Sequence, residues 1–477
     1  MRGALIVKKT KIVCTMGPAS AEPQVLIDMI NAGMDVARLN FSHGTYEDHR
    51  RTMELVRKAA ERCGKAIGVL ADIQGPKIRL GSLDQPVALT EGSTVRLIEG
   101  SFSDRPGYIP VEYSGLLNDI PAGNLIYLAD GLIQLKVEKV EADSLLCRVL
   151  LGGEVSSRKG VTLPGVSVNL PAVTPKDEED IRFAIELGVD FLALSFVRRP
   201  EHILAVRSLM GEAGNDRMII AKIENEEGFK NRYEILEVAD GIMVARGDLG
   251  IEVPPEEVPL IQQSLIRAAN RAGKPVITAT EMLESMIRNP RPTRAEVTDV
   301  AHAILDGTDA IMLSAETATG KYPVAAVEMM ARVARRIESS LNYEEILSKK
   351  RIGPFRSISD AISHATCQTA LDLKAAAIIT STQSGSTARM VSKYRPQAPI
   401  LASTPSWRVK RQLTLSWGVT PILVPPTANT DEMFDVSIDG VVKEGYVKDG
   451  DLVVITAGVR TGVPGSTNIL QVQRIGE

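Results

Sequence analysis

The sequence predicts an α/β protein with a (β/α)8 TIM barrel, an inserted small β-barrel lid domain and a C-terminal α/β open-sheet domain. Three observations lead to this prediction. Eight short apolar runs alternate with helix signals, a long gap separates the third run from the fourth, and the texture of the sequence changes again after about residue 345. A chain of 477 residues is also too long for a single core.

The eight apolar runs are the predicted barrel strands, and they begin at residues 11, 36, 66, 191, 218, 241, 275 and 310. Each run is continuous rather than alternating, which is typical of parallel strands buried on both faces. Helix signals lie between most of them. Thr174, Pro175 and Gly188 have the types expected of an N-cap, a first helical residue and a stop, and Thr45 and Gly64 bracket another helix in the same way.

The gap between the third and fourth runs exceeds one strand-helix unit by roughly the size of a small domain. Its sequence is rich in Gly and Pro and contains alternating strands, which indicates a compact all-β module. Because it leaves at Gly75-Pro76 and returns at Pro171, both connections are expected at one mouth of the barrel, as in a lid. We therefore expect the barrel at 1–76 and 172–345, the lid at 77–171, and a regulatory α/β domain at 346–477.

Composition excludes several classes of protein. A net charge of -4 offers no broad cationic field, so nucleic-acid binding is not expected. The four cysteines are far apart and form neither a zinc pattern nor a disulfide framework. No apolar run approaches the length of a membrane span, and the N-terminus lacks a signal-peptide core. These features predict a cytoplasmic protein with no membrane partner.

Polar residues follow the predicted strands around the ring, where a (β/α)8 barrel carries its site. Charged groups in such a mouth are costly to bury unless they are paired or ligated, so they indicate a bound ion or an anionic ligand. The residues are Arg38, Asn40, Ser42, His43, Asp72, Ser195, Lys222, Glu224, Arg246, Asp248, Thr280, Glu281, Ser314 and Glu316.

Two of these carboxylates, Glu224 and Asp248, follow neighbouring strands and could share a divalent cation such as Mg²⁺. Alternation along the strand sends Lys222 to the same side as Glu224. A cation beside a metal suits phosphoryl transfer or enolate stabilisation. Since no P-loop or protein-kinase motif is present, a nucleotide would be held by side-chain cations and helix N-termini. His43 is a site candidate, with capping or simple exposure as the alternative.

Several segments in the same order resemble the pyruvate kinase family. They are KIVCTMGPAS, ARLNFSHGT, KIENEEGF, MVARGDLGIEVP, TATEMLESMIRNPRPTRAE, IMLSAETATGKYP and SKYRPQAPI, and together they cover essentially the whole chain. The resemblance implies a glycolytic homotetramer that transfers phosphoryl from phosphoenolpyruvate to ADP, giving pyruvate and ATP. It also implies the three domains described above.

The resemblance assigns roles to single residues. Glu224 and Asp248 resemble the ligands of Mg²⁺ (or Mn²⁺), Arg38 a phosphate clamp, and Lys222 the cation at the transferring phosphoryl group. Gly247, Asp248 and Thr280 resemble the substrate carboxylate site, and Thr280 lies where a proton reaches the enolate carbon. Asn40, His43, Arg79 and Lys159 resemble contacts to the nucleotide.

One departure from the family concerns K⁺. Members that require K⁺ carry Thr-Lys after the acid of the third strand and Glu at the position of Lys77, whereas this chain has Asp72-Ile73-Gln74 and then Lys77. We expect the Lys77 ammonium to supply that charge beside Asn40, Ser42 and Asp72, so K⁺ is not expected to be required. The alternative is a solvated hinge lysine.

The C-terminal domain carries a possible effector loop. Thr382, Ser384, Gly385, Ser386 and Thr387 lie between a strand and a helix, as a phosphate nest requires, and the later TAGVRTGVPGSTN could close over them. Two ordinary Gly-rich turns are the alternative. The family binds sugar phosphates or AMP here. Two rival functions also remain open, namely another barrel enzyme acting on phosphoenolpyruvate or pyruvate, and a non-catalytic scaffold.

Overall fold

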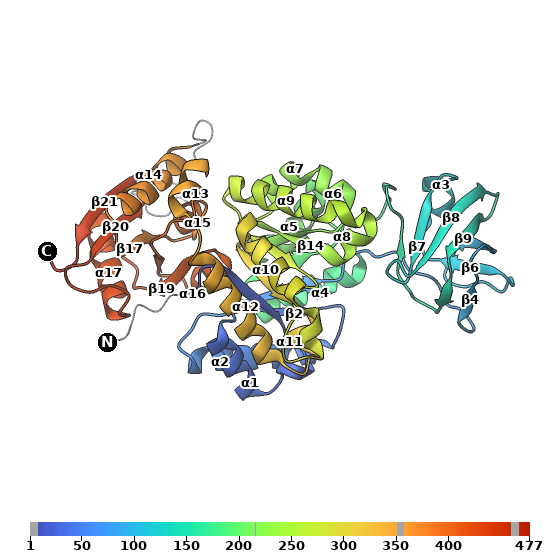
Figure 1. Ribbon diagram of the computed structural model, residues 1–477, viewed down its shortest axis with the longest axis horizontal. Helices are drawn as coiled ribbons and strands as arrows, with labels where there is room; N and C mark the ends of the chain where they lie inside the picture. Colours follow the sequence, from blue (N-terminus) through green and yellow to red (C-terminus); the bar gives the residue numbers. More distant parts are fainter. Residues whose placement is uncertain (1–7, 215, 351–356, 459–466) are drawn as a thin grey trace.

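Eight parallel strands close into a barrel at the centre of the molecule (Figure 1). This computed structural model describes residues 8–214, 216–350, 357–458 and 467–477. All eight predicted strands are present, and neighbours in the closed barrel follow the order β1-β16-β15-β14-β13-β12-β3-β2. Their bounds are β1 (Lys11–Thr15), β2 (Val36–Asn40), β3 (Gly68–Ile73), β12 (Phe191–Leu194), β13 (Met218–Ile223), β14 (Gly241–Ala245), β15 (Val276–Ala279) and β16 (Ala310–Leu313).

Helices surround the barrel and bury its outer face. The predicted caps are confirmed, since the hydroxyl of Thr174 accepts from the backbone of Asp177 and Gly188 ends the helix in a left-handed conformation. The helices of this layer are α1 (Pro23–Ala32), α2 (Tyr46–Arg62), α4 (Pro175–Leu187), α5 (Pro200–Gly214), α6 (Glu226–Lys230), α7 (Arg232–Val238), α8 (Arg246–Glu252), α9 (Val258–Ala272), α10 (Arg294–Asp306), α11 (Ala315–Ala318) and α12 (Pro323–Glu338).

The insert after β3 has an apolar core of its own. Its strands form a six-stranded sheet, β11-β7-β8-β9-β5-β6, and a pair, β10-β4, around that core. The elements are β4 (Val87–Leu89), β5 (Thr94–Glu99), β6 (Tyr108–Val111), α3 (Leu116–Asp119), β7 (Leu125–Leu128), β8 (Ile133–Val140), β9 (Leu145–Leu151), β10 (Gly153–Val155) and β11 (Val161–Thr162). Gly75, in the connection from β3, has a positive φ of 71° that favours glycine.

The C-terminal sheet has the order β19-β18-β17-β20-β21, with only β21 antiparallel. In Figure 1 the barrel separates this sheet from the insert. Neither α17 nor β21 was predicted from the sequence. The elements are α13 (Tyr343–Lys350), α14 (Ile358–Asp372), β17 (Ala377–Ser381), α15 (Ser386–Ser392), β18 (Ile400–Thr404), α16 (Trp407–Gln412), β19 (Val419–Leu423), α17 (Thr430–Lys443), β20 (Leu452–Ala457) and β21 (Ile469–Arg474).

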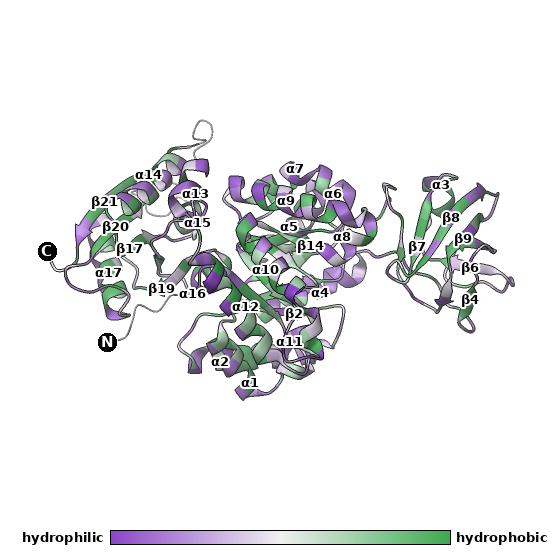
Figure 2. Cartoon of the chain, in the orientation of Figure 1, coloured by the Kyte–Doolittle hydropathy of each residue, from purple (hydrophilic) through white to green (hydrophobic). Residues whose placement is uncertain are grey.

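Hydrophobic residues concentrate in the strands of the barrel and of the insert, whereas the outer helices carry polar faces (Figure 2). All four cysteines are free. Within the described ranges, no helix combines the length and apolar character that a membrane-spanning segment needs.

Four aspartates form the end of the barrel opposite the mouth, and we call them the floor aspartates. They are Asp35, Asp190, Asp240 and Asp309, and each immediately precedes an even-numbered strand of the barrel. Each carboxylate accepts from a backbone N–H at or next to the start of the preceding strand, at 2.8–3.1 Å. Each also pairs with a cation, in the same order Lys8, Arg57, Arg207 and Arg395.

Candidate active site

Lys222 lies at the centre of the mouth, near the end of β13. Its ammonium donates to the hydroxyl of Ser195 at 2.6 Å and pairs with Glu224 Oε1 at 3.0 Å and Asp72 Oδ1 at 3.1 Å. Burial opposes the charged form, but the two carboxylates outweigh burial and raise the pKa of Lys222. The site therefore holds a fixed, desolvated positive charge.

Arg38 supplies a second cation from β2. Its Nε donates to Asp72 Oδ2 at 2.7 Å, and its Nη1 donates to the Thr15 hydroxyl at 2.9 Å. Burial alone would raise the pKa of Asp72, but Lys222 and Arg38 outweigh burial and lower it. Thr15 was missed in the sequence analysis, although it ends the first apolar run and therefore belongs to the same ring.

Glu224 and Asp248 are the two carboxylates expected to bind the metal. Glu224 is 1% exposed, and its Oε2 accepts from the backbone of Phe196 at 2.6 Å. Burial raises the pKa of Glu224, and the negative charge of Asp248 raises it further. A divalent cation would relieve this repulsion. Two carboxylates leave most coordination positions to ligand oxygens and water, which suits Mg²⁺, and no group of three His, Cys, Asp or Glu able to hold a metal occurs among the described residues.

Thr280 has a strained backbone at the end of β15. Its φ is 70°, which is a genuine outlier for a β-branched residue, and strain of this kind clusters at functional sites. Its hydroxyl donates to the carbonyl of Ala279 at 2.5 Å and accepts from the backbone N–H of Gly247 at 2.9 Å. The guanidinium of Arg246 donates to the carbonyl of Thr280 at 2.6 Å. Gly247 and Thr280 are thus brought together, as predicted.

Lys77 pairs with two carboxylates beside the mouth. Its ammonium is 3.3 Å from Asp248 Oδ1 and 3.6 Å from Asp130 Oδ1 of the insert. Lys77 and Asp248 line a cavity of about 450 Å³ between the insert and the barrel. The predicted grouping with Asn40, Ser42 and Asp72 stays a prediction.

The predicted nucleotide contacts lie on two bodies. Asn40 ends β2, its side chain accepts from the backbone of Ser42 at 3.2 Å, and His43 is exposed beside it. Arg79 and Lys159 belong to the insert, where Arg79 forms a bridge with Gly160 and its Nη1 donates to the carbonyl of Arg158 at 3.1 Å. Lys159 is exposed, so its ammonium is free to approach a ligand.

Some members of the polar ring bond to neighbouring backbone or side-chain groups rather than to the residues at the centre of the mouth. Glu316 is 1% exposed and accepts from the backbone of Leu283 at 3.1 Å and of Ser314 at 2.7 Å. Arg246 pairs with Asp299 at 2.7 Å. The ring is therefore a mixture of positioning groups and groups that are free to meet a ligand.

The predicted effector loop precedes α15. Gly385 has a φ of 80° and donates its N–H to the Thr382 hydroxyl at 2.9 Å, while Arg389 donates to the carbonyl of Ser384 at 3.1 Å. The hydroxyl of Thr387 lies 2.8 Å from that of Thr467. The middle of the segment expected to close over this loop, 459–466, lies outside the described residues.

Comparison with known proteins agrees with this geometry. Residues 7–327 match the family described as "Pyruvate kinase, barrel domain", and residues 360–473 match "Pyruvate kinase, alpha/beta domain". A pyruvate kinase of Geobacillus stearothermophilus is 52% identical over 476 residues, which span 98% of this chain and 81% of that protein. Pyruvate kinases of Staphylococcus epidermidis and Staphylococcus aureus are 48% and 47% identical, with the same two coverages. The chain therefore belongs to the pyruvate kinase family of phosphotransferases.

Proposed function

We propose that the barrel mouth transfers a phosphoryl group from phosphoenolpyruvate to ADP, giving pyruvate and ATP. The observation that carries this proposal is the Lys222 ammonium, held by Ser195, Asp72 and Glu224 within 3.1 Å. Phosphoryl transfer requires mainly positioning and cations around spreading negative charge, and this arrangement provides both.

Glu224 and Asp248 would hold Mg²⁺ or Mn²⁺, as the repulsion between the two carboxylates suggests. When bound, such an ion neutralises charge on the phosphoryl and enolate oxygens. Lys222 would stabilise the same charge from the protein side, and Arg38 would anchor the phosphate of the substrate.

Gly247, Asp248 and Thr280 would orient the substrate carboxylate. The backbone N–H of Gly247, whose present acceptor is the Thr280 hydroxyl, would donate to that carboxylate instead. The freed hydroxyl of Thr280 would then take part, through water, in delivering the proton to the enolate carbon.

The insert would act as a lid over this mouth. Arg79 and Lys159 would contact the nucleotide phosphates from the insert, with Asn40 and His43 on the barrel side. Closure would complete the set of cations and exclude water that could hydrolyse the phosphoryl donor. The positive φ of Gly75 supports a hinge at this connection.

We also propose that catalysis does not require K⁺, because the Lys77 ammonium already places a fixed positive charge 3.3 Å from Asp248. Turnover measured in tetramethylammonium buffer should change little when KCl is added. Lys77→Glu should lower turnover in that buffer and should make it respond to K⁺. A large activation of the unaltered enzyme by K⁺ would refute this part of the proposal.

Allosteric activation by a sugar phosphate or AMP at Thr382, Ser384, Gly385, Ser386 and Thr387, in a homotetramer, completes the proposal. The left-handed Gly385 and the hydroxyls around it support a phosphate site. Titration of candidate phosphates against the rate at low phosphoenolpyruvate tests the effector, and sedimentation velocity tests the tetramer.

The reaction itself is tested by following pyruvate with lactate dehydrogenase while phosphoenolpyruvate, ADP and Mg²⁺ are varied in turn. We expect pyruvate to form only when all three are present. Pyruvate formation without ADP would favour another barrel enzyme acting on phosphoenolpyruvate. No turnover under any condition would favour a non-catalytic scaffold.

A further inference from the structure

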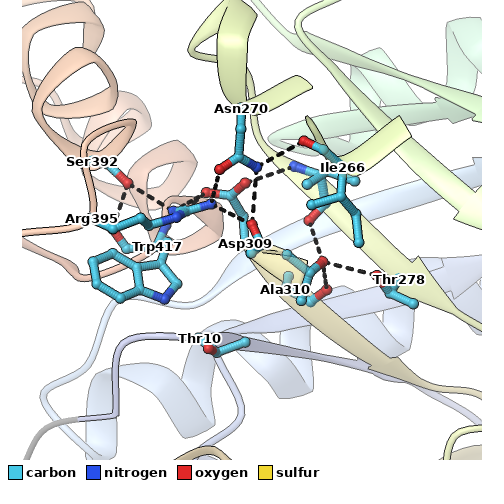
Figure 3. Close-up of polar contacts among 12 residues, drawn as sticks. Thr10, Ile266, Asn270, Thr278, Asp309, Ala310, Ser392, Arg395 and Trp417 are labelled. Atoms are coloured by element: carbon cyan, nitrogen blue, oxygen red, sulfur yellow. Dashed lines mark hydrogen bonds and ion pairs between the residues drawn. The ribbon is translucent and has the colours of Figure 1, made fainter. Parts of the chain in front are cut away.

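A small cavity lies at the junction between the floor of the barrel and the C-terminal domain. Its free volume is about 10 Å³, enough for one water-sized occupant. Four cationic side chains line it, together with one carboxylate, that of Asp309. The cations are Lys274, Arg389, Lys393 and Arg395. We call this the junction cavity, and Figure 3 shows its Arg395 and Asp309 side.

Ion pairs balance only part of this positive charge. Arg395 pairs with Asp309 at 2.8 Å, and Lys393 pairs with Asp360 at 2.6 Å. Lys274 donates to backbone carbonyls, including that of Ala239 at 2.6 Å, and Arg389 donates to the carbonyl of Ser384. Among the described residues, the ion pairs of the cavity therefore account for two of its four cations.

The neighbouring lysine Lys350 is affected by this positive charge. Burial lowers the pKa of Lys350 to about 7, and the charges of Arg395 and Lys393 contribute to that decrease. Lys350 donates to Asn270 Oδ1 at 2.8 Å, next to the cavity. Burial also lowers the pKa of Arg389, whereas the charge of Asp240 raises it. Uncompensated charge in such a place is costly, so a small anion would be stabilised here.

One donor in the cavity wall has no partner. Arg395 is 5% exposed and lies in a left-handed conformation with a φ of 53°. Its Nη1 donates to Asp309 and its Nη2 donates to the carbonyl of Gly307 at 2.8 Å, but its Nε makes no hydrogen bond in the described structure. An unpaired buried N–H of a cation is energetically costly.

We propose that the junction cavity binds a single small inorganic anion of the halide class, which accepts from Arg395 Nε and balances Arg389 and Lys274. The anion fastens the C-terminal domain to the floor of the barrel, because residues of both bodies line the cavity. The site is separate from the barrel mouth and does not depend on the proposed reaction.

The indole of Trp417 offers Arg395 a different partner. The guanidinium carbon lies 4.9 Å from the centroid of that ring, so a cation-π contact could satisfy the face of the group without any anion (Figure 3). That contact leaves the in-plane Nε–H without a hydrogen-bond acceptor, which is why the observations favour the anion.

Crystals of the full-length protein soaked in sodium bromide provide the direct test. We expect an anomalous peak within hydrogen-bonding distance of Arg395 Nε. In solution, the melting temperature should rise in sodium chloride relative to sodium gluconate of equal ionic strength, on the order of 2–4 °C.

Two variants and one control connect this rise to the cavity. Arg395→Lys keeps a cation for Asp309 but removes the Nε–H, and Arg389→Gln removes an unpaired cation, so each should lose the chloride effect. Arg411→Gln is the control, because Arg411 pairs with Asp190 at 2.8 Å at the same junction but does not line the cavity. It should keep the chloride effect.

An empty or water-filled cavity in the bromide-soaked crystal would overturn the proposal. A bromide peak with equal melting temperatures in the two salts would indicate an adventitious ion only and would also overturn it. A chloride effect that survives in both Arg395→Lys and Arg389→Gln would place the responsible ion elsewhere.

Discussion

The two ends of the barrel treat buried charge in opposite ways. At the floor, each of the four aspartates has both a cation and a backbone N–H as partners. At the mouth, Glu224 also pairs with a cation, but its other neighbour is a second carboxylate, Asp248, which raises its pKa. The mouth also contains the strained backbone of Thr280. Each floor carboxylate is balanced by a cation, whereas at the mouth two carboxylates repel one another although each also pairs with a lysine.

A large loss of activity is expected when a carboxylate of the mouth is replaced. Glu224→Gln keeps the size of the side chain and the acceptor for Phe196 but removes the negative charge expected to bind the metal. We expect kcat at fixed Mg²⁺ to fall by more than the roughly 10- to 100-fold typical of a lost outer-shell partner. Titration of activity with Mg²⁺ and Mn²⁺ measures it. An unchanged metal requirement would contradict the assignment of Glu224.

The next prediction concerns the loss of stability when a floor aspartate is replaced. Asp190 is 1% exposed and pairs with Arg57 and Arg411, both at 2.8 Å. Asp190→Ala leaves these two cations without their carboxylate partner and should lower the free energy of unfolding by about 3–5 kcal/mol. Urea denaturation measures the loss. Enzyme that remains folded should keep its kcat, and a selective loss of kcat would contradict the division between floor and mouth.

A smaller effect concerns pH. Burial raises the pKa of Glu252 to about 7, and Asp248 and Glu226 contribute. Because the neutral form is favoured in the folded state, the stability it confers is fully present below the unfolded pKa of about 4.3 and is lost as pH rises through about 7. Glu252→Gln should therefore flatten the fall in unfolding free energy over that range. An identical pH profile in the variant would contradict this.

The smallest expected effect comes from a comparison of two ion pairs of the floor. Asp240 is more exposed than Asp190, at 35% against 1% of its side-chain area, whereas the arginines are alike, at 25% for Arg207 and 28% for Arg57 and Arg411. Arg207→Met should therefore cost only about 1 kcal/mol or less. Urea denaturation of this variant and of Asp190→Ala measures the difference. Equal losses of unfolding free energy would show that burial does not determine how much each floor ion pair contributes to stability.

Local patterns predicted most of the fold. Continuous apolar runs identified all eight barrel strands, and the Thr174, Pro175 and Gly188 signals identified a helix and both of its ends. The antiparallel strand β21 was missed because it lies at a sheet edge and is largely exposed. Alternating polar residues on such an edge lack the continuous apolar signal of the other strands.

The site was predictable where strand ends determine it and not where long-range contacts do. Lys222, Glu224 and Arg38 follow from their places at the ends of apolar runs. The contact of Lys77 with Asp248 does not, because it joins residues 171 positions apart across the connection to the insert. The floor aspartates can be found in the sequence, where they precede alternate strands. Their cationic partners cannot be predicted in this way, because the pairs form only when the barrel closes.

The measurement that tests the central claim most directly is turnover of Lys222→Met beside its circular dichroism spectrum. Asp72 keeps its bond to Arg38 in this variant, and Glu224 keeps its bond to Phe196. We predict a loss of several orders of magnitude in kcat with the fold retained. Near-normal turnover, or a chain that no longer folds, would contradict the claim that this charge serves the reaction rather than the structure.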